Sequence, residues 1–349
     1  MSAPLTIALD AMGGDHAPDM VIAGADEARE RCPNVQFLFF GDEQRIAPLL
    51  DRLPGLKAVS SIRHAPQAIG NDAKPSTALR TGRESSMRLA IDAVARGEAA
   101  CIVSAGNTGA LMAMAKFVLK TLPGIDRPAI ASFIPTLRGE SVMLDLGANI
   151  DCDARNLVEF SVMGAVFART VLGLEEPSIG LLNIGSEELK GHEAIRNAAT
   201  QLRAMPLPGR FHGFIEGDDI ATGTVDVVVT DGFTGNVALK TAEGTAKLFA
   251  EFLRQTFRST AMARMGYLLA SRSFRKLRQR TDPRRYNGAM FLGLQGLCVK
   301  SHGGTDATGF ANAVCVGVDL ASHGFNDKIK QELGRIGSSP LPDPKAAAI

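Results

Sequence analysis

Short, continuously apolar segments alternate with longer amphipathic segments over most of this 349-residue chain. An apolar run without alternation indicates a strand covered on both faces, and an amphipathic segment between two such strands indicates a crossover helix. This order predicts a mostly parallel, doubly wound sheet in an α/β/α sandwich. The expected strands are 5–10, 35–41, 99–104, 129–135, 141–146, 178–184, 211–215 and 225–230, and the expected helices are 20–31, 85–95, 109–120, 154–172, 192–205 and 235–257.

No Pro-, Gly- and Ser-rich linker divides the chain, so we expect a single domain over residues 1–335, followed by a disordered tail at 336–349. A basic segment at about 254–288 is expected to protrude from that domain as an amphipathic helix. Its ten basic residues between Arg254 and Arg285 face only one acid, Asp282. Such a helix can lie on an anionic membrane, bind an acidic protein, or pack its apolar stripe on the body of the domain.

Composition excludes several classes of protein. The net charge of +1 gives no global field that favours nucleic acid. The five cysteines are scattered without a CxxC pair, which argues against a zinc cage or a disulfide framework and for a reduced, cytoplasmic compartment. Neither a signal peptide nor a long uncharged apolar stretch is present, so we expect no membrane span.

Polar residues and glycines follow the first expected strand at once. The strand ends in Asp10, and Gly13, Gly14, Asp15 and His16 come next. Open α/β sheets bind ligands beyond the carboxyl ends of their strands, and glycine lets the backbone approach a ligand closely. Both acids would repel an anion, so we expect them to orient His16, a backbone turn or a lysine.

Two later loops share the pattern V-[ST]-x-G-x-T-G, and each opens a helical pattern. Free backbone N–H groups at a helix start attract anions, so the loops predict a shared anion site, with plain helix capping as the alternative. Neither loop carries a dinucleotide or nucleoside-triphosphate fingerprint, which favours a smaller anion. The candidate residues are Ser104, Gly106, Asn107, Thr108 and Gly109 in the first loop and Asp231, Gly232, Thr234, Gly235 and Asn236 in the second.

Three further strand ends carry neutral donors and cations. Asn149 and Asn183 are amides able to stabilise developing negative charge, and Lys190 can neutralise an anion. The turn Lys300-Ser301-His302-Gly303 pairs a cation with a histidine. No GxSxG elbow and no cluster with metal-ligand spacing occurs. These groups are typical of catalysis by positioning and charge stabilisation.

In these blocks the chain resembles the PlsX family, the bacterial phosphate acyltransferases of fatty acid and phospholipid synthesis. The resemblance extends in order from Ile7 to Gly324. The matching blocks are Ala8-Leu-Asp10-Ala-Met-Gly-Gly-Asp15, Ser104-Ala-Gly-Asn-Thr-Gly-Ala110, Asp145-Leu-Gly-Ala-Asn149, Leu182-Asn-Ile-Gly-Ser-Glu-Glu188, Glu216-Gly-Asp218, Thr230-Asp-Gly-Phe-Thr-Gly-Asn236 and Val299-Lys-Ser-His-Gly303.

The resemblance implies transfer of a long acyl group from acyl carrier protein to inorganic phosphate. The acyl phosphate product would pass to a membrane glycerol-3-phosphate acyltransferase. It also implies a cytoplasmic homodimer that associates peripherally with the inner face of the membrane, without nucleic acid, metal or a tightly bound organic cofactor. The implied fold is that of phosphotransacetylases and isopropylmalate dehydrogenases.

The residues add a mechanism to this expectation. The two loops would hold phosphate against the thioester carbonyl, helped by Lys190 or Lys300. Asn149, Asn183 or a backbone N–H would stabilise the tetrahedral oxyanion, and His302 or His16 would protonate the leaving thiolate. The expected contacts of the basic segment with membrane or carrier protein are Arg264, Leu268, Leu269, Arg272, Arg275, Lys276 and Arg278.

Two alternatives stay open at this point. An NAD-dependent oxidoreductase of the same fold type would bind its cofactor without the usual fingerprint, and nicotinamide-dependent absorbance changes would reveal it. A non-catalytic scaffold that binds acyl carrier protein would need the basic segment alone, and the anion-binding strand ends would then have no purpose.

Overall fold

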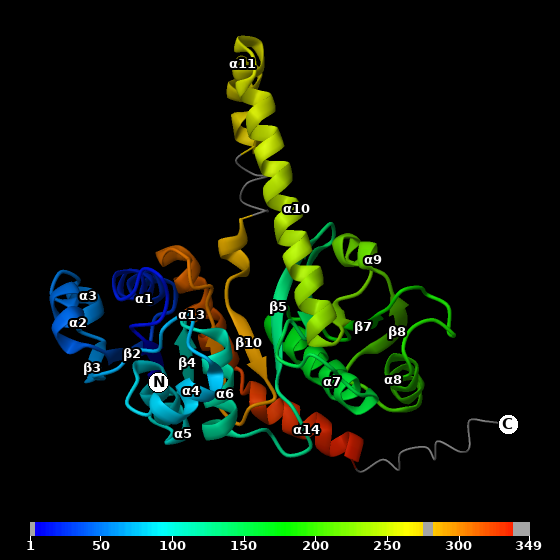
Figure 1. Ribbon diagram of the computed structural model, residues 1–349, viewed down its shortest axis with the longest axis horizontal. Coiled ribbons are helices and arrows are strands. Elements are labelled where there is room, and N and C mark those ends of the chain that lie inside the picture. Colours follow the sequence, from blue (N-terminus) through cyan, green and yellow to red (C-terminus); the bar gives the residue numbers. More distant parts are fainter. Residues whose placement is uncertain (1–3, 275–281, 338–349) are drawn as a thin grey trace.

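The computed structural model describes residues 4–274 and 282–337, and in them the strands form one eleven-stranded sheet (Figure 1). The strand order is β3-β2-β1-β4-β11-β10-β5-β6-β9-β7-β8. The strands are β1 (Leu5–Asp10), β2 (Val35–Gly41), β3 (Ser60–His64), β4 (Cys101–Ser104), β5 (Ala129–Thr136), β6 (Gly139–Leu144), β7 (Ser178–Leu182), β8 (Arg210–Ile215), β9 (Val227–Val229), β10 (Ala289–Leu292) and β11 (Leu297–Lys300).

Two parallel sets of strands run in opposite directions. The first set is β3, β2, β1, β4 and β11, and the second is β6, β9, β7 and β8. Between them, β10 is antiparallel to β11 and to β5, and β5 is antiparallel to β6. The doubly wound, mostly parallel fold is therefore confirmed, with a reversal at its centre that the sequence pattern did not indicate. The carboxyl ends of the two sets therefore point in opposite directions, while the strand registers place them at nearly the same level along the strands.

Helices cover both faces of the sheet. The helices are α1 (Asp19–Arg31), α2 (Glu43–Leu50), α3 (Pro54–Lys57), α4 (Pro75–Thr81), α5 (Ser86–Ala95), α6 (Thr108–Leu119), α7 (Ala154–Val171), α8 (Glu193–Ala204), α9 (Gly217–Thr222), α10 (Gly232–Arg258), α11 (Ala261–Leu269), η1 (Pro283–Tyr286), α13 (Ala307–Ser322) and α14 (Phe325–Gly337). One apolar core contains buried residues of α1, α7, α8, α13 and α14, and the other contains those of α4, α5 and α6. The result is the expected three-layer sandwich.

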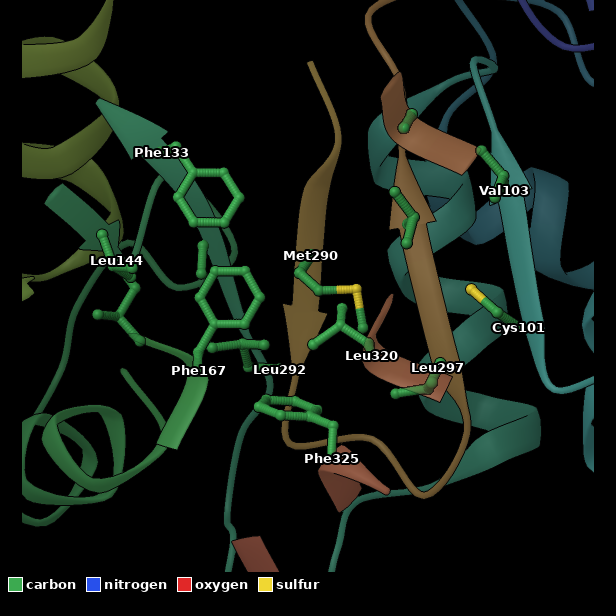
Figure 2. Close-up of a cluster of buried hydrophobic side chains, with 14 of the residues drawn as sticks. Cys101, Val103, Phe133, Leu144, Phe167, Met290, Leu292, Leu297, Leu320 and Phe325 are labelled. Atoms are coloured by element: carbon green, nitrogen blue, oxygen red, sulfur yellow. The ribbon is translucent and has the colours of Figure 1, made fainter. Parts of the chain in front are cut away.

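The centre of the first core joins the two halves of the sheet. Phe167 of α7 stacks on Phe133 of β5 with ring centroids 5.2 Å apart, and its ring meets the edge of Phe325 of α14 at 5.8 Å (Figure 2). Met290 and Leu292 of β10 lie in the same cluster and are fully buried. This apolar core is therefore continuous beneath the strand reversal.

Helix α10 leaves the body of the protein and carries α11 at its far end (Figure 1). Only Gly232 and Gly235 among its 27 residues are buried. The projection therefore starts within α10, well before the expected residue 254. Arg275, Lys276 and Arg278 of the expected contact set lie outside the described residues, as does the tail from residue 338, and α14 continues the fold to Gly337.

Within the described residues, no helix combines the length and the apolar character needed to cross a membrane.

Candidate functional site

Three neighbouring strand ends of the first parallel set form one group of polar residues. Leu9 of β1 pairs with Val103 of β4, so the next residues, Asp10 and Ser104, lie side by side. Ser104 in turn pairs with Lys300 of β11. We call the loops that follow these strands, residues 10–16, 104–109 and 300–304, the first cluster. The fold thus brings together the opening loop, the first glycine loop and the late lysine–histidine turn.

Asp10 is buried at the base of the first cluster. Its carboxylate accepts hydrogen bonds from Ser86 Oγ at 2.6 Å and Ser104 Oγ at 2.7 Å. Burial raises the pKa of Asp10, while the two hydroxyls and the charge of Lys300 act in the opposite direction. The contacts agree with the expectation that this acid orients other groups.

Lys300 supplies the cation of the first cluster. Burial lowers the pKa of its ammonium to about 8, although the negative charges of Asp10 and Asp15 act to raise it. Its Nζ donates to the backbone oxygens of Ser301 and Ala105. Ser301 is buried, and its Oγ accepts from Asn287 Nδ2 at 2.8 Å. The lysine is therefore charged at neutral pH and held against the first glycine loop.

Glycines allow the loops of the first cluster to touch. A Cβ atom on Gly13 would lie 2.5 Å from the Asp10 carboxylate and 2.7 Å from the backbone nitrogen of Gly106. Gly14 has a φ of +107° and lies beneath the carbonyl of Gly303. A side chain at either position would push apart the loops that follow β1, β4 and β11.

The two candidate histidines stand at the exposed rim of the first cluster. His302 Nδ1 accepts from Gly304 N at 3.2 Å, so the neutral ring carries its proton on Nε2. Asp15 binds the other side of this turn, donating its backbone N–H to Gly303 O at 2.9 Å and accepting from Asn71 Nδ2 at 2.8 Å. His16 is exposed next to it.

The first glycine loop ends at the N-terminus of α6. Asn107 caps this helix by accepting from Ala110 N at 2.9 Å, and its Nδ2 donates to Asn71 O and Ala73 O. The capping alternative thus describes Asn107. The exposed hydroxyl of Thr108 makes no hydrogen bond within the described residues, and it lies in the first turn of α6, next to the capping Asn107.

The strand ends of the second parallel set form a second cluster, residues 145–149, 183–191 and 230–236. At its base Asp145 accepts from the backbone nitrogens of Ile130, Gly147, Ala148 and Asn149 and from Asn149 Nδ2. Burial raises the pKa of Asp145 and these bonds oppose the rise. Asn149 Nδ2 also donates to Pro128 O at 2.8 Å, so both hydrogens of that amide are used within the protein.

The second glycine loop is held closed by its own residues. Asp231 caps α10, accepting from both the backbone nitrogen and the hydroxyl of Thr234 at 2.8 Å. Gly232 N donates to Asn149 O at 2.7 Å, and a Cβ on Gly235 would overlap the carbonyl of Asp145. Capping therefore describes this loop too, although Asn236 remains exposed beside it.

The remaining candidates lie on the loop after β7. Asn183 Nδ2 donates to Lys190 O at 3.1 Å, and its buried Oδ1 accepts no hydrogen bond within the described part of the chain. The side chain of Lys190 is exposed. This loop offers one unused acceptor and one surface cation.

The prediction that both glycine loops form one shared site stays a prediction. In the registers, Ser104 is level with Lys300, Ala289, Ser132 and Met143, four strand spacings across the sheet. Four spacings are about 19 Å. Because β10 and β5 reverse the strand direction, the loops after β4 and after β6 and β9 leave the sheet in opposite directions, from strand ends that lie at nearly the same level.

Sequence reasoning missed three positioning residues. Ser86 donates a hydrogen bond to Asp10. Asn71 donates to Asp15, and its backbone oxygen accepts from Asn107. Asn287 donates to Ser301 and accepts from the backbone nitrogen of His302. The Asn-Gly pair at 287–288 marked a turn, but none of the three lies beside its partner in sequence.

Comparisons with known proteins agree with these motifs. The sequence profile of a family described as fatty acid synthesis protein matches residues 5–328. A phosphate acyltransferase of Rhodospirillum centenum is 75% identical over 96% of this chain and 95% of its own length. Phosphate acyltransferases of Paramagnetospirillum magneticum and Rhodospirillum rubrum are 61% and 62% identical, over 100% and 97% of this chain and 99% and 97% of their own lengths.

Solved structures show the same fold at low sequence identity. A phosphotransacetylase of Streptococcus pyogenes has a TM-score of 0.62 and 17% identity, covering 92% of this chain and 95% of its own. The EutD phosphotransacetylase of Staphylococcus aureus has a TM-score of 0.58 and 16% identity, with coverage of 91% and 94%. From the profile match and the close relatives, the chain belongs to the fatty acid synthesis protein family, the bacterial phosphate acyltransferases that its motifs resemble.

Proposed function

We propose that this protein is a phosphate acyltransferase that moves a long acyl group from acyl carrier protein to inorganic phosphate. The observation that carries the proposal is the first cluster, where a buried lysine, the N-terminus of α6 and glycine-containing loops meet at three strand ends. Relatives named phosphate acyltransferase over nearly the whole chain support the same reaction. The product would serve phospholipid synthesis through a membrane glycerol-3-phosphate acyltransferase.

In this proposal the first cluster binds the phosphate. The ammonium of Lys300 and the N-terminus of α6 attract the anion, and the free hydroxyl of Thr108 donates to one of its oxygens. Asp10 keeps Ser104 and Ser86 in place beneath the loop. The charge of its carboxylate is offset by the neighbouring ammonium of Lys300, which limits its repulsion of phosphate.

The reaction itself needs no enzyme nucleophile. A phosphate oxygen attacks the thioester carbon, and the C–O bond forms while the carbonyl becomes a tetrahedral oxyanion. The oxyanion then collapses, the C–S bond breaks, and the carrier thiolate takes a proton from His302, His16 or solvent. The protein contributes position and charge stabilisation, and one well-placed oxyanion donor is worth about 3 kcal/mol in other acyl-transfer enzymes. Asn149 is a poor oxyanion donor as placed, because its amide hydrogens are already used.

The test is incubation with palmitoyl carrier protein and phosphate. We expect one free carrier thiol to appear for each acyl phosphate trapped by hydroxylamine, and neither product without phosphate. Thiol release without phosphate would identify a thioesterase. No release at all would support the scaffold alternative, and dependence on a nicotinamide cofactor would support the oxidoreductase.

We also propose that the protein is a homodimer that pairs through α10. Phe233, Val237, Leu248 and Phe252 are each more than half exposed, and at 100° per residue they fall within about 100° of the helix circumference. An apolar stripe of this length on a projecting helix needs a cover, and a second copy would supply one. Sedimentation velocity tests this: Phe252→Glu should shift a dimer to monomer, and an unchanged dimer would rule out this face.

For the end of the projection we propose contact with the inner face of the cytoplasmic membrane. Met262, Leu268 and Leu269 of α11 are 79%, 69% and 85% exposed, and Arg264 and Arg272 are exposed beside them. Apolar residues with flanking arginines match an anionic lipid surface. Leu268→Glu with Leu269→Glu should abolish flotation with vesicles containing anionic lipid, and retained flotation would refute the contact.

A further inference from the structure

A depression on the protein surface lies between α4, α5 and α6, away from both projecting helices. Its volume is about 470 Å³, and it is lined by Ser76, Leu79, Arg80, Arg83, Arg88 and Phe117. Three of these six side chains are guanidinium groups, whereas the chain as a whole has a net charge of only +1. Neither the candidate site nor the proposed dimer and membrane surfaces use these residues.

The charge of the depression is mostly uncompensated. Arg88 pairs with Asp92 at 2.9 Å. Arg80 and Arg83 are exposed and make no ion pair within residues 4–274 and 282–337. Lys116 adds another exposed cation on α6, a helix that contains no acid. The surface therefore presents a local excess of positive charge to an approaching partner.

An exposed aromatic side chain stands among these cations. Phe117 is 63% exposed, and the guanidinium of Arg88 lies 5.7 Å from the centre of its ring. Contact with the guanidinium of Arg88 restricts the ring, which reduces the conformational entropy lost when a partner covers it. Arg and aromatic residues dominate the energetics of protein interfaces, and this pairing places both in one recess.

The same three helices also support the first cluster. Ser86 at the start of α5 binds Asp10, and Asn107 at the start of α6 binds the segment that leads into α4. Nine residues of α6 separate Thr108 from Phe117, a rise of about 14 Å. A protein seated on the depression would therefore stand beside the first cluster, within reach of it for a flexible prosthetic arm.

We propose that this depression is the docking site for the acyl carrier protein, an inference that rests on the proposed function. An acidic helix of the carrier lies against Arg80, Arg83 and Arg88 and places an apolar side chain on Phe117. Its acyl-bearing arm then extends along α6 to the phosphate in the first cluster. Charge complementarity favours an acidic protein over a lipid here, because Phe117 and Leu79 are the only large apolar groups in the lining.

The test measures binding and turnover separately. Fluorescence anisotropy of labelled carrier protein gives Kd for the full-length wild type, for Arg80→Glu with Arg83→Glu, and for Phe117→Ser. A matched control reverses two exposed arginines elsewhere, Arg52→Glu with Arg63→Glu, and a second control reverses Arg264 and Arg272 on the projection. Circular dichroism confirms that each variant is folded.

We expect the pocket variants to raise Kd and the KM for acyl carrier protein at least tenfold, with kcat unchanged. The two controls should stay within twofold, and the difference should shrink as salt is raised. If the reversal of Arg264 and Arg272 raises the Kd for carrier protein and the pocket variants do not, the proposal is wrong. So does a loss of affinity for inorganic phosphate in the pocket variants, which would make the depression a small-anion site. If the wild type does not turn over acyl carrier protein at all, the proposed function is wrong. If the wild type does turn it over and the pocket variants do so equally well, only the docking proposal is wrong.

Discussion

The first and second clusters are built from similar sequences and differ in what they leave free. Both place a buried aspartate below a glycine loop that opens a helix. Asp10 accepts from two serine hydroxyls next to a buried lysine, whereas Asp145 accepts from five N–H groups and has no lysine at its base. The buried cation and the unused Thr108 hydroxyl in the first cluster suit an anionic ligand. The hydrogen bonds that Asp145 and Asp231 accept in the second cluster suit a structural joint.

The difference shows that a loop motif does not by itself carry a function. Asn107 and Asp231 each cap the helix that follows them, but only the second loop also uses up its threonine hydroxyl. The partners of a motif, which come from distant strands, decide whether it is available to a ligand. Six substitutions and a pH profile test this contrast between the clusters.

The largest effect is expected from removing the cation of the first cluster. Lys300→Met should lower phosphate-dependent kcat/KM by about 100- to 1000-fold, the loss typical of one well-placed electrostatic donor. Lys190→Met in the second cluster should cost much less, because Lys190 is exposed. Initial rates at varied phosphate measure both. A larger loss at Lys190 would reverse the comparison and move the phosphate to the second cluster.

The second cluster should matter most for stability. Asp145→Ala leaves five donors without their acceptor and should lower the free energy of unfolding by about 3 kcal/mol. Asp231→Ala removes only a helix cap, and its cost should be about 1 kcal/mol. Urea denaturation of the two variants gives these values. Equal losses would show that Asp145 is not the joint described above.

Raising the pH should separate activity from stability through Lys300. Its pKa of about 8 in the folded protein lies below that of a free lysine. Above pH 8 the unfolded chain therefore binds more protons than the folded chain, and the free energy of unfolding rises with pH. Phosphate affinity should fall over the same range, by about tenfold per pH unit, as the ammonium is lost. The pH profiles of KM for phosphate and of urea midpoints test this. Lys300→Met should lose both trends, and their persistence would assign them to other groups.

The smallest effects compare the two glycine loops directly. Thr108→Val should raise the KM for phosphate about tenfold, the value of one hydrogen bond to a charged group. Asn236→Ala should leave phosphate-dependent turnover within twofold, because the second loop follows strands that lie at least four spacings, about 19 Å, across the sheet from the first cluster. If Asn236→Ala proves the more damaging change, the second loop contributes to phosphate binding.

Much of the fold was predictable because a buried strand appears in the sequence as a short, continuous apolar run. The bounds of β1 and β2 match the expected ranges, and most other expected strands and helices differ by a few residues at their ends. Three strands were missed for identifiable reasons. β3, Ser60–His64, is a polar edge strand, and β10 and β11 have four residues each, too short for a pattern to form.

Only part of the arrangement of the candidate site could be predicted from the sequence. Asp10, Ser104 and Lys300 meet as expected, because they end parallel strands of one set. The distance between the two glycine loops depends on β10 and β5 running against their neighbours, and hydrophobic patterning carries no strand direction. For the same reason the sequence could not show that the amide of Asn149 is already used.

The place of β11 in the sheet has a consequence for synthesis of the chain. β4 ends at Ser104, and its neighbour β11 begins only at Leu297. At 5–20 residues per second, roughly 10–40 s separate the two on the ribosome. During that interval the apolar edge of β4 is open, and an open edge invites pairing with other chains. Nascent chains stalled before residue 297 should therefore require a holding chaperone, and release of β11 should end that requirement.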